Sequence, residues 1–235
     1  MTGTILNFFA IITGGLIGLL LGNRFSEKIR LTIMNALGLF TMLYGIRLFT
    51  QTNNAMVVLV SLILGILLGE WLKIEEALGL LAIWFEKKFN KNNNEDSNRF
   101  IKGFLTTSLL YCIGPMAILG SIQDGLTGDF NTLAIKAVID GISAIAFASS
   151  LGVGVLFSSV IVILYQGIIT LLAAQIQFLM SDVMLSEVNA LGGIMLVGLA
   201  VSSLLEIRKI RVANFLPGFL IVPFIVLLFK YLGIY

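Results

Sequence analysis

The sequence predicts an all-α protein, a polytopic bundle of about eight transmembrane helices. Hydrophobic residues make up 58% of the 235 residues and charged residues only 12%, about half the charge of a soluble domain. The mean hydropathy is +1.02. Apolar runs long enough to cross about 30 Å of hydrocarbon recur along the whole chain. These observations indicate a multi-pass protein whose main partner is the lipid bilayer.

Eight apolar runs have the length of a membrane span. They cover residues 5–22, 31–49, 55–72, 103–122, 133–149, 153–180, 189–205 and 215–232. Only residues 149–152 separate the fifth run from the sixth. A fused run would be far too long for one span, so we predict a tight hairpin there.

The distribution of basic residues predicts the orientation. With the N-terminus outside, twelve of the fifteen Lys and Arg residues fall in the inner connections. The outer connections at 124–129 and 182–187 are acidic. Cytoplasmic loops carry the excess of Lys and Arg in membrane proteins. We therefore expect both termini outside, in the cytoplasmic (inner) membrane of a bacterium.

One long polar connection divides the chain into three parts. We expect a three-span unit at 1–72, a cytoplasmic connection at 73–99 and a five-span unit at 100–235. The start of the connection has apolar residues at helical spacing, which are Ile74, Leu78, Leu81, Phe85 and Phe89. This pattern is typical of an amphipathic helix lying on the membrane surface. The Asn-rich residues 90–98 have the composition of a linker.

Small residues repeat every four positions on three of the predicted spans. The repeats are Gly14, Gly18 and Gly22; Gly65 and Gly69; and Ala144, Ala148 and Gly152. Such faces allow helices to approach closely in lipid. They fit either packing inside one bundle or the contact surface of a homo-oligomer.

A short repeated motif hints at internal symmetry. The tetrapeptide Asn-Ala-Leu-Gly begins at Asn35 near the start of the second predicted span and at Asn189 at the start of the seventh. These spans would run in opposite directions, as related elements do in inverted-repeat transporters. Both asparagines suit helix caps, and equally suit ligand contacts at helix starts.

The fourth predicted span contains a break that a lipid-facing helix does not need. Gly114 and Pro115 interrupt it, because proline removes a backbone donor and clashes with the preceding turn. Carbonyl groups freed at membrane depth must face protein or a water-filled cavity. The run then ends in a polar segment, residues 123–129, which we expect to form a turn at the outer face.

The fifth predicted span carries two ionisable residues, Lys136 and Asp140, one helical turn apart. Ionisable side chains inside spans are costly and indicate function by default. Two interpretations are open. The pair neutralises itself as a structural pair, or Asp140 is a proton or cation site that Lys136 tunes.

Other residues complete the candidate site. Gln123 and Asp124 offer oxygens suited to a hard cation, although this segment is equally ordinary turn chemistry. Further candidates for the lining are Ser143, Ser149 and Gln166. Whether the site takes a metal ion is left open.

The segment from Tyr111 to Leu151 resembles a known family. The resemblance lies in residues 114–129, in Lys136, in Asp140-Gly141 and in residues 147–154, with Tyr165-Gln166-Gly167 and Gly14-Gly15 agreeing. These blocks are similar to the bacterial integral membrane proteins typified by YqgA and YdfK, a domain-of-unknown-function family. The resemblance covers the whole chain and implies a small polytopic membrane protein, usually suspected of transport, without a defined substrate.

The function that these features favour is secondary transport of a small ion or small polar metabolite, in which cation coupling would use Asp140. An ion channel would need the same polar lining. A non-transporting scaffold or regulatory subunit is the alternative from another class. We expect no enzyme and no cofactor, because no nucleophile and base are paired and the chain has no His. The net charge of +2 gives no reason to expect nucleic acid.

Overall fold

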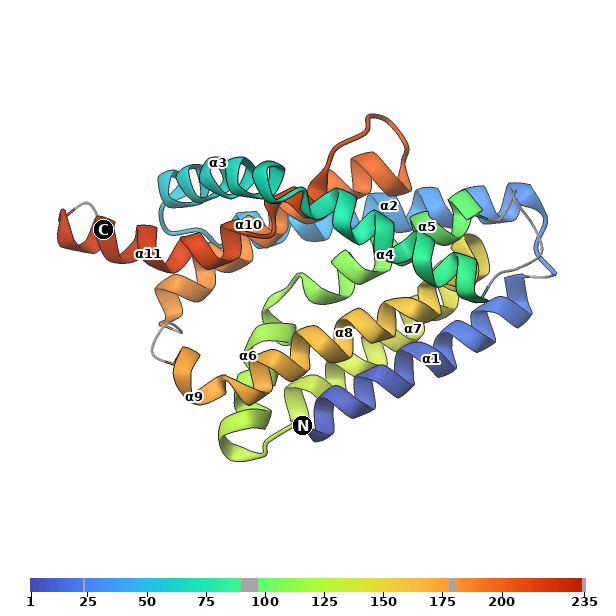
Figure 1. Ribbon diagram of the computed structural model, residues 1–235, viewed down its shortest axis with the longest axis horizontal. Helices are drawn as coiled ribbons and strands as arrows, with labels where there is room; N and C mark the ends of the chain where they lie inside the picture. Colours follow the sequence, from blue (N-terminus) through green and yellow to red (C-terminus); the bar gives the residue numbers. More distant parts are fainter. Residues whose placement is uncertain (23, 90–96, 178–180, 234–235) are drawn as a thin grey trace. The chain divides into compact units, whose positions relative to one another are not determined.

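The computed structural model describes residues 1–22, 24–89, 97–177 and 181–233 (Figure 1). All secondary structure within these residues is helical, which confirms the all-α prediction. The helices are α1 (Thr2–Gly22), α2 (Glu27–Phe49), α3 (Ala55–Leu72), α4 (Ile74–Phe89), α5 (Ser97–Cys112), α6 (Pro115–Thr127), α7 (Asn131–Leu151), α8 (Gly154–Leu171), α9 (Ala173–Ile176), α10 (Asp182–Leu199) and α11 (Gly218–Tyr231). A π-helical turn, Ala200–Leu204, continues α10, and a 3₁₀ turn, Val212–Phe215, precedes α11.

Seven described helices, in two cases with an adjoining turn, are long and apolar enough to cross a membrane. The pair α5 and α6 adds an eighth span if it crosses as one bent element, with an angle of 60° between its halves. This agrees with the prediction of about eight spans. The predicted hairpin between the fifth and sixth spans is confirmed, since α7 ends at Leu151 and α8 begins at Gly154. Parts of two predicted segments, the linker 90–98 and the end of the run 153–180, lie outside the described residues.

Two helix boundaries differ from the prediction. Residues 123–127 belong to α6 and do not form a turn, which begins only at Gly128 with φ of 73°. The seventh span begins at Asp182, because Ser181 caps α10 by accepting a hydrogen bond from the Met184 amide. Asn35 and Asn189 therefore lie inside α2 and α10, and neither is a helix cap. Both predictions were wrong because the helices α6 and α10 continue through the polar residues beside each apolar run.

The chain forms two compact units. Unit 1 contains Met1–Ala36 and Gly79–Ile176, and unit 2 contains Leu37–Leu78 and Gln177–Tyr235. Each unit thus combines segments from both sides of the connection at 73–99. The division into parts 1–72, 73–99 and 100–235 describes order along the sequence and stays a prediction.

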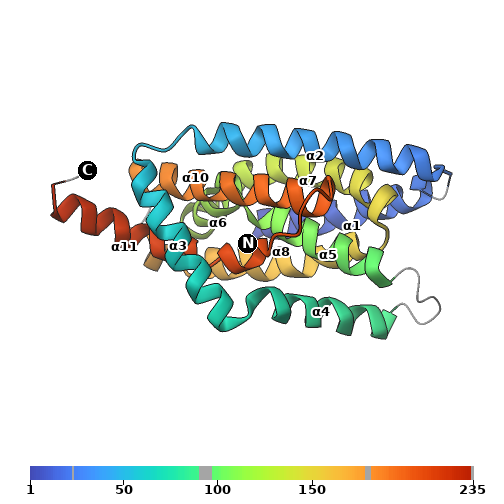
Figure 2. The ribbon, with the colours of Figure 1, turned by 90° about the horizontal axis from the view of Figure 1, so that it is seen from above.

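Unit 1 is built around the contact between α1 and α7. A Cβ atom on Gly14, Gly18 or Gly22 would lie 2.1 to 2.6 Å from a backbone oxygen of α7. The three oxygens belong to Gly141, Ile145 and Ser149, which follow one another in the same order as the glycines. The two helices therefore run in the same direction with their backbones in contact. Figures 1 and 2 show them side by side.

The other helices of unit 1 pack around this pair. Helix α8 runs opposite to α1, because Gly15 near the middle of α1 meets Leu156 at the start of α8, and Gly167 near the end of α8 meets Met1. The C-terminal part of α4 packs on α5 and α8 through an aromatic cluster that includes Phe85, Phe100 and Phe157. The predicted amphipathic helix is thus present, and its position on a membrane surface stays a prediction.

Unit 2 also contains close glycine contacts. Gly45 of α2 and Gly193 of α10 each face the carbonyl oxygen of the other. A Cβ atom added at Gly45 would lie 2.6 Å from the Gly193 oxygen, and one added at Gly193 would lie 2.4 Å from the Gly45 oxygen. Gly65 of α3 lies against Gly218 at the start of α11, and Gly69 lies against Asn214 in the 3₁₀ turn before it. The glycine faces of α1 and α3 are therefore occupied by helices of their own units. The homo-oligomer and the inverted repeat stay predictions.

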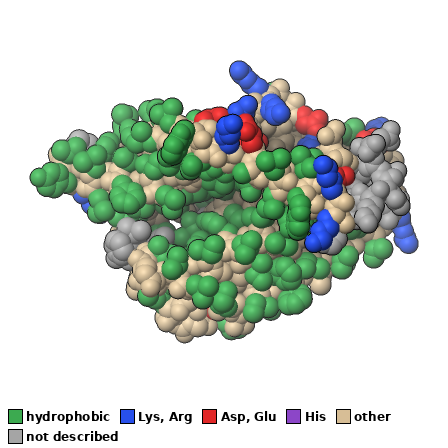
Figure 3. Space-filling view, viewed as in Figure 1, with side chains coloured by type: hydrophobic (Ala, Val, Ile, Leu, Met, Phe, Trp, Pro, Cys, Tyr) green, Lys and Arg blue, Asp and Glu red, His purple; other side chains and the backbone are tan. Residues whose placement is uncertain are grey.

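Helix directions within each unit agree with a chain that crosses eight times. The parallel pair α1 and α7 would be the first and fifth spans, and the antiparallel pair α3 and α11 the third and eighth. Hydrophobic side chains cover the flank of unit 1 formed by α1 and α8 (Figure 3). Leu20 of α1 and Leu171 of α8 are each 71% exposed, as expected for residues that face lipid.

Candidate functional site

The break between α5 and α6 lies beside the ionisable pair of α7. Gly114 has φ of 139° and ψ of 155°, a conformation that strongly favours glycine. Pro115 follows as the first residue of α6, where its missing N–H costs nothing. The break places Tyr111, on the last turn of α5, against α7, with its ring centre 5.9 Å from Lys136 Nζ.

Lys136 and Asp140 are both buried, each with 6% of its surface exposed. Lys136 Nζ donates to Asp140 Oδ2, so the pair is formed as its i, i+4 spacing predicts. Two charges buried together without other partners are costly.

Two amides from other helices extend the pair into a network. Asn7 Nδ2 of α1 donates to Asp140 Oδ2 at 2.9 Å and lies 3.5 Å from Gln166 Oε1 of α8. Asn7 and Gln166 are both fully buried. We call Asn7, Lys136, Asp140 and Gln166 the polar cluster. It brings together residues separated by as many as 159 positions in the sequence.

Tyr111 and Ser143 flank the polar cluster. Ser143 Oγ lies 2.9 Å from the Asp140 carbonyl oxygen and 3.5 Å from Tyr111 Oη. Tyr111 is 1% exposed. The sequence predicts Lys136, Asp140, Ser143 and Gln166 as site residues, but not Asn7 or Tyr111. An amide inside an apolar run, the signal that singled out Gln166, would have identified Asn7 as well.

Several buried polar atoms in and beside the polar cluster have no hydrogen-bond partner among the described residues. They are Asn7 Oδ1, Gln166 Nε2, Thr4 Oγ1 and Thr170 Oγ1. Thr4 lies three residues before Asn7 on α1, and Thr170 lies four residues after Gln166 on α8, so each shares a helix face with a cluster amide. Buried polar groups are almost always satisfied by protein or ordered water. The polar cluster therefore offers both an acceptor and donors to a small polar species.

Gln123 and Asp124 lie at the end of α6 and join it to neighbouring helices. Gln123 Oε1 accepts from Thr132 Oγ1 of α7 at 2.7 Å. Asp124 is 4% exposed and accepts from the Gly3 amide at 3.0 Å and from the Met1 nitrogen at 3.0 Å. The Asp124 carboxylate thus accepts hydrogen bonds from donors at the start of α1, where a negative charge is favourable. Their proposed role in holding a cation stays a prediction.

The remaining candidates are Ser149, Asn35 and Asn189, which are not members of the polar cluster. Ser149 Oγ donates to the Ala146 carbonyl at 2.7 Å, near the end of α7. Asn35 is exposed on α2. Asn189 Nδ2 reaches Gln51 Oε1 at 3.4 Å within unit 2. No group of three His, Cys, Asp or Glu side chains that could hold a metal ion is found in the described ranges.

Unit 2 contains a buried carboxylate that the sequence reasoning placed in a loop. Glu187 is fully buried and accepts from Thr52 Oγ1 and from the amides of Asn53 and Asn54. These contacts fix the turn between α2 and α3. These hydrogen bonds explain why a carboxylate is buried at this position and give Glu187 a structural role.

Comparison with known proteins agrees with the predicted resemblance. The family model described as "Protein of unknown function (DUF554)" matches residues 2–227. The uncharacterized membrane protein YdfK of Bacillus subtilis (strain 168) is 30% identical over 238 residues, covering 100% of this chain and 99% of YdfK. The uncharacterized protein YqgA of Escherichia coli (strain K12) is 28% identical over 220 residues, covering 93% of each chain. No solved structure matches this chain. With its apolar helices and its match over nearly the whole length, the chain belongs to the DUF554 family.

Proposed function

We propose that the protein is a secondary transporter of the bacterial cytoplasmic membrane that carries a small ion or a small polar metabolite. The observation that carries this proposal is the polar cluster. Three helices bring two charges and two amides together inside a protein with many exposed hydrophobic side chains. Polar groups at such a position are typical of substrate and ion pathways.

The chemistry of the polar cluster fits a coupling site. Lys136 and Asp140 compensate each other in the present arrangement, so the site is close to neutral when no further ion is bound. Protonation of Asp140, or approach of a cation to it, would weaken the Lys136 contact and the Asn7 hydrogen bond together. The chain has no His, so a carboxylate is the natural proton carrier.

The break in the fourth span supplies a place where the backbone can move. The Cβ position at Gly114 has no heavy atom within 4 Å. Hinges are a few terminal residues of elements that absorb large changes in φ and ψ. A change at Gly114 would move Tyr111 relative to α6, and Tyr111 lies against Lys136. In transporters, broken helices commonly line the binding site.

Reconstituted transport tests the proposal. The purified protein is placed in liposomes, and uptake of labelled inorganic ions, amino acids and small organic acids is measured with and without imposed proton and sodium gradients. We expect saturable uptake that Asp140→Asn reduces to the background of empty liposomes. Asp129→Asn is the matched control, because Asp129 is exposed and Asn keeps an acceptor for the Asn131 amide.

Further measurements on the same purified protein separate the alternatives. Unitary conductance steps in planar bilayers would indicate a channel, because a carrier moves solute without producing such steps. Absence of movement for every solute in the panel by the unaltered, folded protein would reject transport. A stoichiometric partner that co-purifies in that case would favour the scaffold. Size-exclusion chromatography and thermal unfolding of Asp140→Asn show whether loss of transport reflects loss of folding.

A further inference from the structure

A second polar site lies at the opposite end of unit 1. A pocket of about 180 Å³ is bordered by the ends of α1 and α7 and by the starts of α2, α5 and α8. Its volume is roughly ten times the ~15 Å³ that one water molecule needs. The charged side chains among the described residues of its lining are both arginines, Arg30 and Arg99.

Backbone carbonyls hold the two guanidinium groups in place. Arg30 Nη2 donates to the Gly22 carbonyl of α1 at 2.7 Å. Arg99 Nε donates to the Ser150 carbonyl of α7 at 2.9 Å, and its Nη2 lies 3.5 Å from the Ser149 carbonyl. Basic side chains often satisfy the last carbonyls of a helix in this way. Capping does not explain Arg30 Nε, which is buried and has no partner among the described residues.

The start of α8 adds a further positive feature to the pocket. Gly152, with φ of 80°, and Val153 line the pocket and directly precede α8. No side chain caps this helix, whose N-cap is Val153. The first amides of an 18-residue helix carry a partial positive charge and attract anions. The Val155 and Leu156 amides at this start already donate to the Gly152 and Val153 carbonyls, so the start of α8 contributes only its partial positive charge. The unpartnered Arg30 Nε is the group that requires an acceptor.

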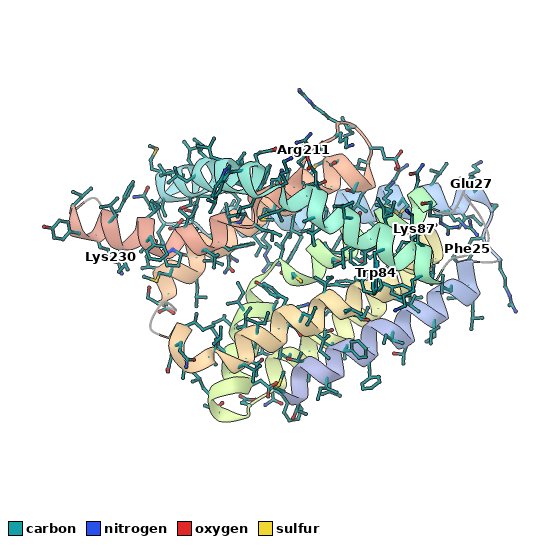
Figure 4. All side chains as sticks on the ribbon, in the orientation of Figure 1. Phe25, Glu27, Trp84, Lys87, Arg211 and Lys230 are labelled. Carbon is teal, nitrogen blue, oxygen red and sulfur yellow. The ribbon has the colours of Figure 1, made fainter. Side chains whose placement is uncertain are left out.

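We propose that this pocket binds a phosphate group, held by Arg30 and Arg99 and by the start of α8. Planar guanidinium groups match the oxygens of phosphate and are weakly enough hydrated to bind in a half-buried site. Figures 1 and 2 place the ends of α1 and α4 and the start of α5 toward the same end of unit 1. Lys87, labelled in Figure 4, lies near the end of α4. The distribution of basic residues predicts that this end is cytoplasmic, where both lipid headgroups and soluble phosphorylated molecules are available.

Binding of defined probes to the purified full chain in detergent tests the proposal. The probes are inorganic phosphate, with chloride at equal ionic strength as its control, and dioctanoyl phosphatidic acid, with dioctanoylglycerol as its phosphate-free match. Native mass spectrometry measures occupancy on the folded protein. Arg30→Gln should weaken binding of the phosphate-bearing probe by about tenfold to a hundredfold, the range for one lost charge-assisted hydrogen bond. Arg208→Gln, an exposed arginine outside the pocket, should leave binding unchanged.

The outcomes are distinguishable. Binding of phosphatidic acid alone identifies a lipid headgroup site, and binding of both probes identifies a site for soluble phosphate compounds. Arg30→Lys keeps the charge but lacks Nε, so it should bind less tightly than the unaltered protein even if Arg30→Gln does not fold. Binding no better than that of chloride and dioctanoylglycerol, or equal binding by the Arg30 variants and the unaltered protein, would overturn the proposal. Transport activity plays no part in this test.

Discussion

Asp140 has two partners, one close to it along the chain and one distant. Lys136 is one turn away on the same helix, and its approach follows from helix geometry alone. Asn7 is 133 positions away and reaches Asp140 only because α1 and α7 have their backbones in contact. The i, i+4 pair was therefore predictable from the sequence. The Asn7 contact was not, because it depends on which helices pack together.

Substitution of the charged pair separates its structural role from its functional one. Lys136→Met should destabilise the protein by about 3–5 kcal/mol, because Asp140 would be left buried without a compensating charge. The double variant Lys136→Met with Asp140→Asn removes both charges and should recover much of that loss. Thermal unfolding in detergent measures both values. A double variant that is as destabilised as Lys136→Met, or more so, would contradict this expectation, because removal of the second charge would then recover nothing.

At the scale of the elements, the spacing of the glycines in α1 determines how this helix packs. Their spacing of four residues predicted a close contact, and the structure shows that α7 of the same unit makes it. The partner could not be predicted, since a small-residue face fits any other close surface. The break before α6 followed from Gly114 and Pro115, whereas the start of α10 and the roles of Asp124 and Glu187 were not predicted. Asp124 accepts from a backbone amide of α1, and Glu187 accepts from amides of the turn between α2 and α3, in both cases far away in the sequence.

The contact between α1 and α7 makes a direct prediction for glycine substitution. Gly14→Ala would place Cβ 2.1 Å from the Gly141 oxygen, a rigid backbone atom. We expect destabilisation of about 1–3 kcal/mol, the usual cost of overpacking. Gly79→Ala is the matched control, because nothing lies within 4 Å of its Cβ position on α4. Alanine favours a helix over glycine by up to about 1 kcal/mol, so the control should be neutral or slightly stabilising in thermal unfolding.

For the whole molecule, the number of crossings depends on the pair α5 and α6. The eight apolar runs were visible in the sequence because each is long enough to span the bilayer. Helix directions inside the two units are those of an alternating chain, but they do not state which side is cytoplasmic. The interleaving of the two units, each drawn from segments on both sides of residues 73–99, left no local signal in the sequence.

Thiol labelling of intact cells tests both the orientation and the bent pair. Cys112 is buried and is replaced by Ser to give a cysteine-free background. Exposed residues are then changed one at a time in Lys87→Cys, Asp129→Cys and Arg208→Cys. We expect a membrane-impermeant reagent to label only Asp129→Cys in intact cells and all three after permeabilisation. The reason is that Asp129 follows the bent pair at the predicted outer face, while Lys87 and Arg208 lie in basic connections that are predicted to be cytoplasmic. Labelling of Lys87→Cys and Asp129→Cys from the same side would mean that α5 and α6 enter and leave the membrane without crossing it. Labelling of Lys87→Cys and Arg208→Cys alone would reverse the orientation, and would place the phosphate pocket outside and the polar cluster in the inner half of the membrane.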